Sequence, residues 1–273
     1  MVFVSGETPT EAEATAIEKL RELIGVVPPA KVGPALDAPA SLLRWVRGYQ
    51  LDAKEAAKAF AQMLAYRAEN SIDAAREEMF AASDDGASPV WPADLPRFKK
   101  LVEITGDGLM RRIGHAASGN PATLVLLHEY QLKQVIKAGL VALIIQLQQY
   151  QDEWWSVELF EQSIAAGYLL ARDDIVHAGD LGLFHFDIAC ARAFPQVLAG
   201  SKHYPEVSAR IISVGNGKAL IAMYNAVIRP FMPAHTKEKI HVFGKDLNTS
   251  ANVASLALEP ATLRTLLEQI GYA

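Results

Sequence analysis

Residues Tyr204 to Gly244 read YPEVSARIISVGNGKALIAMYNAVIRPFMPAHTKEKIHVFG, and this stretch decides the fold. Its middle is unusual, because Ala219 to Ile228 holds nine apolar residues and one polar residue, Asn225. A surface helix normally has one apolar stripe and one polar face, so both faces of this helix need a neighbour other than water. The helix is therefore either buried in the core, or it faces a protein cavity on one side and an oily surface on the other.

The flanks of this helix are basic. The segment from Gly200 to Lys245 holds seven Lys or Arg against two Glu, a formal charge of +5, in a chain whose net charge is −5, so the remainder carries −10. An apolar helix framed by cations in an acidic protein indicates contact with an anionic lipid surface. A core helix with solvated neighbours explains the composition equally well.

Composition limits the class of protein. The 273 residues, 51% hydrophobic and 21% charged, indicate one large globular domain plus a small one. Because Cys190 is the single cysteine, an internal disulfide framework and a cysteine-based zinc site are excluded. The first residues show no secretory signal, and the longest apolar run, Ala138 to Ile145, is far shorter than the ~20 residues of a spanning helix. We therefore expect a cytoplasmic protein whose membrane contact is peripheral.

The N-terminal part is predicted to be helical. Thr8 to Glu11 form a capping box, and Leu42 to Arg47 form a short helix that ends at Gly48. Asp52 caps a longer helix whose buried stripe is Ala56, Phe60, Met63, Leu64 and the stem of Arg67. The polar run from Ser83 to Pro89 is a break, so we expect a helical subdomain over 8–84 and a second domain over 85–273.

The second part alternates strands with helices, which favours a mainly parallel α/β sheet. The predicted helices are Gln131–Tyr150, Ser156–Ala171, Ala251–Leu258 and Leu263–Gln269. The predicted strands are Ala122–Leu127, Leu181–Ile188, Arg210–Val214 and Lys239–Phe243.

Six ordered sequence pieces, spanning roughly residues 38 to 272, together resemble the CRAL-TRIO lipid-binding family. They are Leu42–Arg47 with Leu51-Asp52, Ala56 and Tyr66-Arg67; Gly119-Asn120-Pro121; Asp187; Tyr204-Pro205-Glu206 with Asn216; Arg229–Met232 with Thr236–Gly244; and Leu267–Gly271. Three positions depart from the family pattern, namely Asn120, Cys190 and Val207. The short segment from Asp187 to Tyr204 also departs from it, which makes binding of a choline headgroup less favoured.

The resemblance implies a small all-α subdomain followed by a bowl-shaped, mainly parallel sheet that is flanked by helices and closed by a gate helix at Lys218–Ile228. It implies a carrier that binds one hydrophobic lipid, such as the phospholipid phosphatidylinositol, and transfers or presents it between membranes without catalysis. No cofactor, metal or nucleic acid is implied.

The resemblance also assigns residues. The lipid headgroup would be bound by Glu206, Thr236 and Lys239, with Lys239 paired to Glu206. The gate residues that contact acyl chains would be Ile221, Met223, Tyr224, Val227, Ile228 and Phe231. The basic residues that face an anionic membrane would be Lys218, Arg229, Lys237 and Lys245.

Other interpretations remain. The bowl could be filled with side chains, which would make the chain a protein-interaction module, or it could carry a hydrophobic ligand that is not a phospholipid. Gly215-Asn216-Gly217 partly mimics a dinucleotide fingerprint, but Leu220 occupies the place of its third glycine. Five residues could suggest a metal site, namely Asp173, Asp174, His177, His185 and Asp187. We favour the alternative that they are polar positions of a helix end, a turn and a strand. Trp154 and Trp155 are expected to pack between helices.

Overall fold

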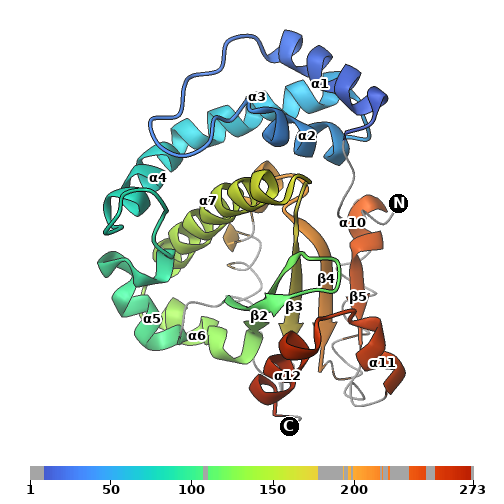
Figure 1. Ribbon diagram of the computed structural model, residues 1–273. Helices are drawn as coiled ribbons and strands as arrows, with labels where there is room; N and C mark the ends of the chain where they lie inside the picture. Colours follow the sequence, from blue (N-terminus) through green and yellow to red (C-terminus); the bar gives the residue numbers. More distant parts are fainter. Residues whose placement is uncertain are drawn as a thin grey trace.

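The computed structural model describes residues 9–106, 110–177, 193, 196, 197, 199–215, 217, 221, 234–243 and 250–271. Figure 1 shows an arc of N-terminal helices over a long helix, with the sheet and the C-terminal helices on the other side. The helices before the sheet are α1 (Glu11–Ile24), α2 (Pro39–Gly48), α3 (Ala53–Glu69), α4 (Ile72–Ala81) and α5 (Lys99–Thr105), with the 3-10 turns η1 (Pro92–Asp94) and η2 (Pro96–Phe98).

Five strands make the sheet of the described residues: β1 (Arg111–His115), β2 (Pro121–Leu126), β3 (Arg172–His177), β4 (Ser208–Val214) and β5 (Ile240–Val242). They lie side by side in chain order, with β1 antiparallel to β2 and the other neighbours parallel. The remaining elements are η3 (Leu127–Tyr130), α6 (Leu132–Lys137), α7 (Val141–Ala166), η5 (Ser201–His203), α10 (Ala234–Lys239), α11 (Ser250–Ser255) and α12 (Pro260–Gln269). The α/β class and the mainly parallel sheet are confirmed.

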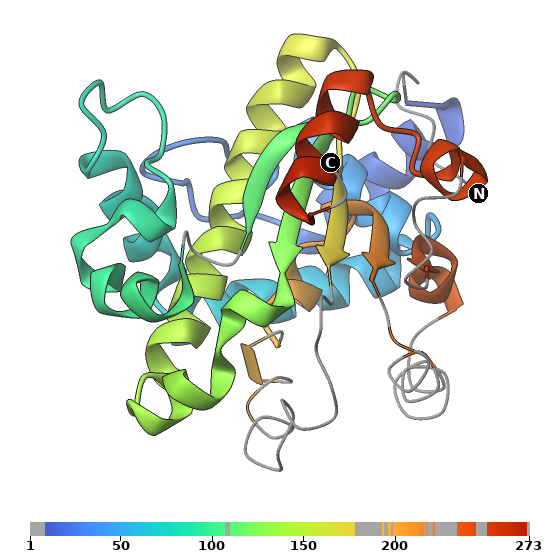
Figure 2. The same ribbon diagram turned by 90° about the horizontal axis from the view of Figure 1, so that it is seen from below.

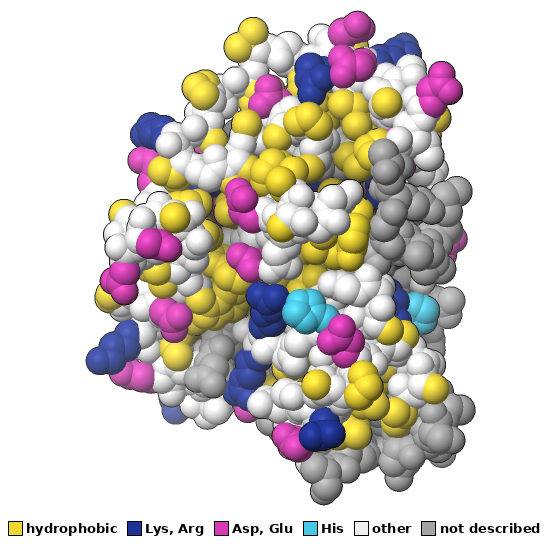
Figure 3. Space-filling view, in the orientation of Figure 1, with side chains coloured by type: hydrophobic (Ala, Val, Ile, Leu, Met, Phe, Trp, Pro, Cys, Tyr) yellow, Lys and Arg dark blue, Asp and Glu magenta, His cyan; other side chains and the backbone are white. Residues whose placement is uncertain are grey.

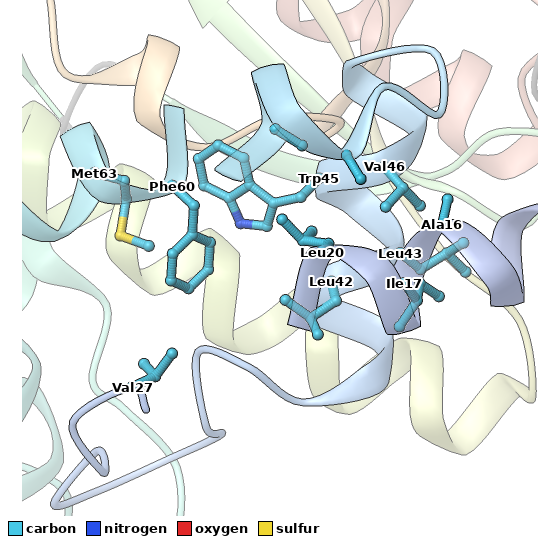
Figure 4. Close-up of a cluster of buried hydrophobic side chains, with 12 residues drawn as sticks. Ala16, Ile17, Leu20, Val27, Leu42, Leu43, Trp45, Val46, Phe60 and Met63 are labelled. Carbon is cyan, nitrogen blue, oxygen red and sulfur yellow. The ribbon is translucent and has the colours of Figure 1, made fainter. Parts of the chain in front are cut away.

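The N-terminal helices form near their predicted positions, but the capping box of α1 lies two residues later than the predicted Thr8 to Glu11. Thr10 and Glu13 make a complete capping box on α1, and the Asp52 carboxylate accepts hydrogen bonds from two backbone N–H groups at the start of α3. Figure 4 shows how Leu20, Leu42 and Phe60 meet between α1, α2 and α3. The predicted stripe of α3 is buried except for the half-buried Leu64.

A second apolar cluster joins α4 to α5, α6 and α7. It contains Ala75 and Met79 from before residue 84, and Leu101, Ile144 and Leu147 from after it. The loop at 83–88 is therefore a break in secondary structure across which the core is continuous. The division into 8–84 and 85–273 stays a prediction.

The long helix α7 corrects one prediction. Instead of two helices meeting near residues 150–156, α7 runs unbroken over 26 residues, and the break lies earlier, at Gly139. No Gly or Pro interrupts the sequence from Val141 to Ala166. The polar residues that suggested an end, among them Gln151, Asp152 and Glu153, are buried and have partners.

Strand β3 corrects another. We expected a turn at Asp173 and Asp174, yet both lie in a central strand and are buried. Asp173 is paired with Arg210 on β4, and Asp174 accepts hydrogen bonds from Thr123 on β2 and Ser208 on β4. Partners from neighbouring strands therefore make these carboxylates compatible with a buried strand. The predicted strand at 181–188, with His185, Asp187 and Cys190, lies outside the described residues.

Glu153 joins the N-terminal helices to α7. Its carboxylate is fully buried and is bound by Arg67 on α3 at 2.7 and 2.9 Å, by Arg76 on α4 at 2.5 Å and by the Tyr204 hydroxyl at 2.9 Å. Burial opposes ionisation, but the two guanidinium groups outweigh it and lower the pKa of Glu153 to about 2.

We predict that Glu153→Gln lowers the free energy of unfolding by roughly 3–5 kcal/mol at neutral pH, because it leaves two buried guanidinium groups without their carboxylate. Urea denaturation followed by circular dichroism measures the change. The control is Glu161→Gln on the exposed face of the same helix, which should stay within about 0.5 kcal/mol of wild type. Equal stability of both variants would contradict this account of the helical interface.

Candidate functional site

The two faces of the sheet are covered differently. On one face Leu124, Ile175 and Ile212 are buried against Leu256 and Leu266 of the C-terminal region. Figure 2 shows α12 on that side of the strands and α7 on the other. The face toward α7 is the front face from here on. Central parallel strands are normally buried on both faces, so the covering of the front face is informative.

Apolar side chains of the front face are only half-buried. Neighbouring strands place Val125, Val176, Ser213 and Val242 in one row across β2 to β5. Each of the four is half-buried, and so are Ile211 and Ile240 in the next row. The α7 side chain Trp155 packs near Val125 at the β2 end of this face. Apart from the polar Ser213, the rest of the row is apolar and lies beyond this packing. Together with Ile211 and Ile240 it forms an apolar wall.

The predicted gate follows β4 directly. Ile221 is helical and half-buried, and its N–H donates to the Gly217 carbonyl. The other predicted gate and acyl-contact residues lie outside the described residues; they are Met223, Tyr224, Val227, Ile228 and Phe231. The same holds for the predicted basic residues Lys218, Arg229 and Lys245, whereas Lys237 lies in α10 and is half-buried.

Two of the three predicted headgroup residues are in contact. Lys239, the last residue of α10, places its Nζ 2.9 Å from both carboxylate oxygens of Glu206 and 3.3 Å from the Ser208 carbonyl. The side chains of Lys239 and Glu206 are 18% and 9% exposed. The pair stands where β4 and β5 begin. Thr236 lies three residues before Lys239 in α10.

Helix α2 supports this pair from behind. The Arg44 guanidinium is buried and donates to the Glu206 carbonyl at 2.7 Å and to the Leu170 carbonyl at 2.5 Å. Glu206 has a φ of 56°, a left-handed conformation that is costly for a residue other than glycine. Gly48 gives the chain room, because a Cβ there would lie 2.9 Å from that of Pro205.

Sequence reasoning missed this role of Arg44. The sequence pattern places Arg44 only within a helical motif of the family resemblance. The available signal was an arginine between Leu43 and Trp45 in an otherwise apolar run, since a cation at such a position must find partners when the helix is buried.

A buried polar cluster lies where the front face meets α7. Asp174 is 2.7 Å from the Arg172 guanidinium, which also lies over the Trp155 ring at 5.4 Å. Asp152 on α7 accepts from Ser201 at 2.9 Å and from Gln148 at 3.0 Å, and burial raises its pKa to about 6. Among the described residues no group of three His, Cys, Asp or Glu side chains could hold a metal ion.

No helix among the described residues is sufficiently long and apolar to cross a bilayer. The described part of the sheet and its surroundings therefore gives a paired Glu206–Lys239 on an apolar wall. It also gives a buried polar cluster, which has hydrogen-bonding and ionic partners within the chain.

Comparison with solved structures identifies the fold. The crystal structure of Sfh5, a yeast protein of the CRAL-TRIO type, matches with a TM-score of 0.53 and 14% sequence identity, over 98% of this chain and all of the Sfh5 chain. At this identity the likeness shows the fold alone, and it confirms the CRAL-TRIO fold that the sequence motifs predicted. No family model and no curated protein matches the sequence.

We predict that Arg44→Leu lowers the free energy of unfolding by about 2–4 kcal/mol, because it leaves two buried carbonyl groups without a donor. Urea denaturation measures the change, with the exposed Arg264→Leu as the control. Wild-type stability of Arg44→Leu would show that the carbonyls of Glu206 and Leu170 need no support from α2.

Asp152 should make stability depend on pH in a defined direction. Its pKa is raised from 3.8 to about 6, so the folded protein binds this proton more tightly than the unfolded chain. The stabilisation is complete below the unfolded value and is lost as the pH rises through about 6. We predict that the difference in unfolding free energy between wild type and Asp152→Asn shifts in favour of the variant over that interval, as measured by urea denaturation at a series of pH values. A difference that is independent of pH would contradict it.

Proposed function

We propose that this protein binds a single lipid, a phospholipid such as phosphatidylinositol, over the front face of the sheet and transfers or presents it between membranes. The observation that carries the proposal is the Glu206–Lys239 pair beside a half-buried apolar wall. A polar headgroup and an apolar tail both find a matching surface there. The protein would do no chemistry on the lipid and would need no cofactor.

The size of the hydrophobic effect explains why a carrier needs such a wall. A phospholipid with roughly 30 methylene groups costs on the order of 25 kcal/mol to expose to water, at ~0.8 kcal/mol for each group. A carrier must therefore cover nearly all of the acyl surface. The half-buried apolar surface extends across β2 to β5 and consists of Val125, Val176, Ile211, Ile240 and Val242.

The headgroup roles follow from the chemistry of the pair. The Lys239 ammonium can donate to a phosphate oxygen, and the Glu206 carboxylate holds the ammonium in place. Inositol hydroxyls can donate to the Glu206 carboxylate. We assign Thr236, one helical turn away, a hydroxyl contact to the phosphate.

The membrane step is assigned to the gate. In this proposal the apolar segment at 218–228 and Phe231 close over the acyl chains and enter the bilayer surface when they open. Lys218, Arg229, Lys237 and Lys245 would meet anionic lipids, which favours a peripheral, cytoplasmic protein. Support for this step comes from the sequence and from the fold shared with Sfh5.

Mass spectrometry of an organic extract tests whether a lipid is carried at all. We expect one lipid per protein molecule in the extract of the purified full chain. A lipid-free extract together with no transfer between vesicles would favour a protein-interaction module. A stoichiometric apolar compound without phosphate would favour a carrier of another ligand class, and stabilisation by NAD or ATP without any lipid effect would favour a nucleotide site.

Lys239→Ala tests the headgroup assignment. We predict that it slows transfer of phosphatidylinositol between vesicles about tenfold or more, because a charge-assisted contact to phosphate is lost. The exposed Lys54→Ala on α3 is the matched control and should keep most of the transfer rate. The double variant Lys239→Met with Glu206→Gln removes the pair without leaving an unpaired buried carboxylate, so an effect through folding is separated. Unchanged transfer in both Lys239 variants would remove the assignment.

A further inference from the structure

A hollow lies at the β1 edge of the sheet, which is the edge opposite to the Glu206–Lys239 pair. It has a volume of about 360 Å³ and lies between η1, α5, β1 and α7. Figure 3 faces it: hydrophobic side chains gather in the furrow between the α5 side of the molecule and the β1 side, with basic side chains on its border. Its volume falls in the range of roughly 300–1,000 Å³ that is usual for small-molecule sites. We call it the tryptophan pocket, because Trp91, Trp154 and Trp155 line it.

The three indole rings form a preorganised wall. Trp154 stands edge-on to Trp91 at 4.8 Å and to Trp155 at 4.9 Å. Two of their N–H groups are already used inside the protein. Trp154 donates to the Pro89 carbonyl at 2.9 Å, and Trp155 donates to the Met110 sulfur at 3.1 Å. The ring of Trp154 therefore offers carbon surface to the pocket, and so do Trp91 and Val102. Trp155 is only 1% exposed, so it supports this wall from inside the protein.

The charged rim gives the pocket a direction. It carries the guanidinium groups of Arg111 and Arg112 and the carboxylate of Asp94. Arg111 is held by Glu129 at 2.6 Å and by Gln269 at 3.0 Å. Arg112 is held less tightly. It lies 3.5 Å from Glu158 and 3.3 Å from the His115 ring, and its side chain is 42% exposed.

A guanidinium in this setting can turn its fork to an incoming carboxylate at little cost, because its contact with Glu158 is long and solvated. The pocket thus combines an aromatic wall with one available cationic donor at its mouth. The pocket lies at β1, one edge of the five-stranded sheet, whereas the Glu206–Lys239 pair lies at β4 and β5, near the opposite edge.

We propose that the tryptophan pocket is a second ligand site, which takes an apolar carboxylate such as a medium-chain fatty acid. The chain packs on Trp91 and Trp154, and the carboxylate is bound by Arg112. This site is separate from the proposed phospholipid site and does not depend on it.

Intrinsic fluorescence reports on the pocket directly, because three of the four tryptophans of the chain line it and the fourth, Trp45, is buried between α2 and α3. Decanoate is the probe and decanol its uncharged match. We expect a saturable change in fluorescence with both probes. We also expect Arg112→Gln to weaken decanoate binding roughly tenfold while leaving decanol binding unchanged. The exposed Arg264→Gln is the matched control and should change neither.

Ala93→Leu places extra volume on the pocket lining and should abolish the response to both probes, whereas Ala261→Leu on the exposed face of α12 should not. The phosphatidylinositol transfer rate of Ala93→Leu should equal that of wild type, and Lys239→Ala should keep the fluorescence response, so the two proposals fail separately. A fluorescence change that persists in Ala93→Leu, or no saturable change in wild type, would overturn the site. Equal binding of decanoate to wild type and Arg112→Gln would overturn the carboxylate preference.

Discussion

The Glu153 carboxylate is completely buried, and it fixes how the N-terminal helices sit on the rest of the molecule. It binds arginines from α3 and α4 together with the Tyr204 hydroxyl. One acidic group on α7 therefore joins the helix pair α3–α4 to the segment at Tyr204, although these parts are far apart in the chain. A buried ion pair of this kind adds little net stability compared with apolar packing, but breaking it is costly. It therefore acts chiefly on geometry, and the segment that follows Tyr204 leads directly to Glu206.

The segment after Tyr204 is held by α2, and these contacts support the candidate headgroup pair. Arg44 on α2 holds the carbonyl of Glu206, and the absence of a side chain at Gly48 lets Pro205 approach α2. The position of the Glu206 carboxylate thus depends on contacts made by the N-terminal helices as well as on the sheet. This is why the helical part and the sheet part of the fold share one site.

Local sequence signals predicted the elements that depend on local physics. The Asp52 cap and the apolar stripe of α3 rest on interactions within a few residues. The start of α1 was also predicted, but its capping box joins Thr10 to Glu13 and not Thr8 to Glu11. Strand β2, strand β4 and the pair of Glu206 with Lys239 were also predicted, the last from a family resemblance.

Other features could not be predicted, because their stability comes from distant partners. Asp173 and Asp174 suggest a turn until Arg210, Thr123 and Ser208 are brought beside them. Buried polar residues in the middle of α7 suggest a helix end for the same reason. Among the described residues the pairing of β5 with β4 is short. It covers Ile240 to Val242 and one further hydrogen bond from the Phe243 N–H to the Ser213 carbonyl, and Lys239 immediately precedes it. Loss of this short pairing would separate the Lys239 ammonium from the Glu206 carboxylate while the central strands stay paired. The integrity of the candidate headgroup pair therefore depends on the shortest strand pairing of the described sheet.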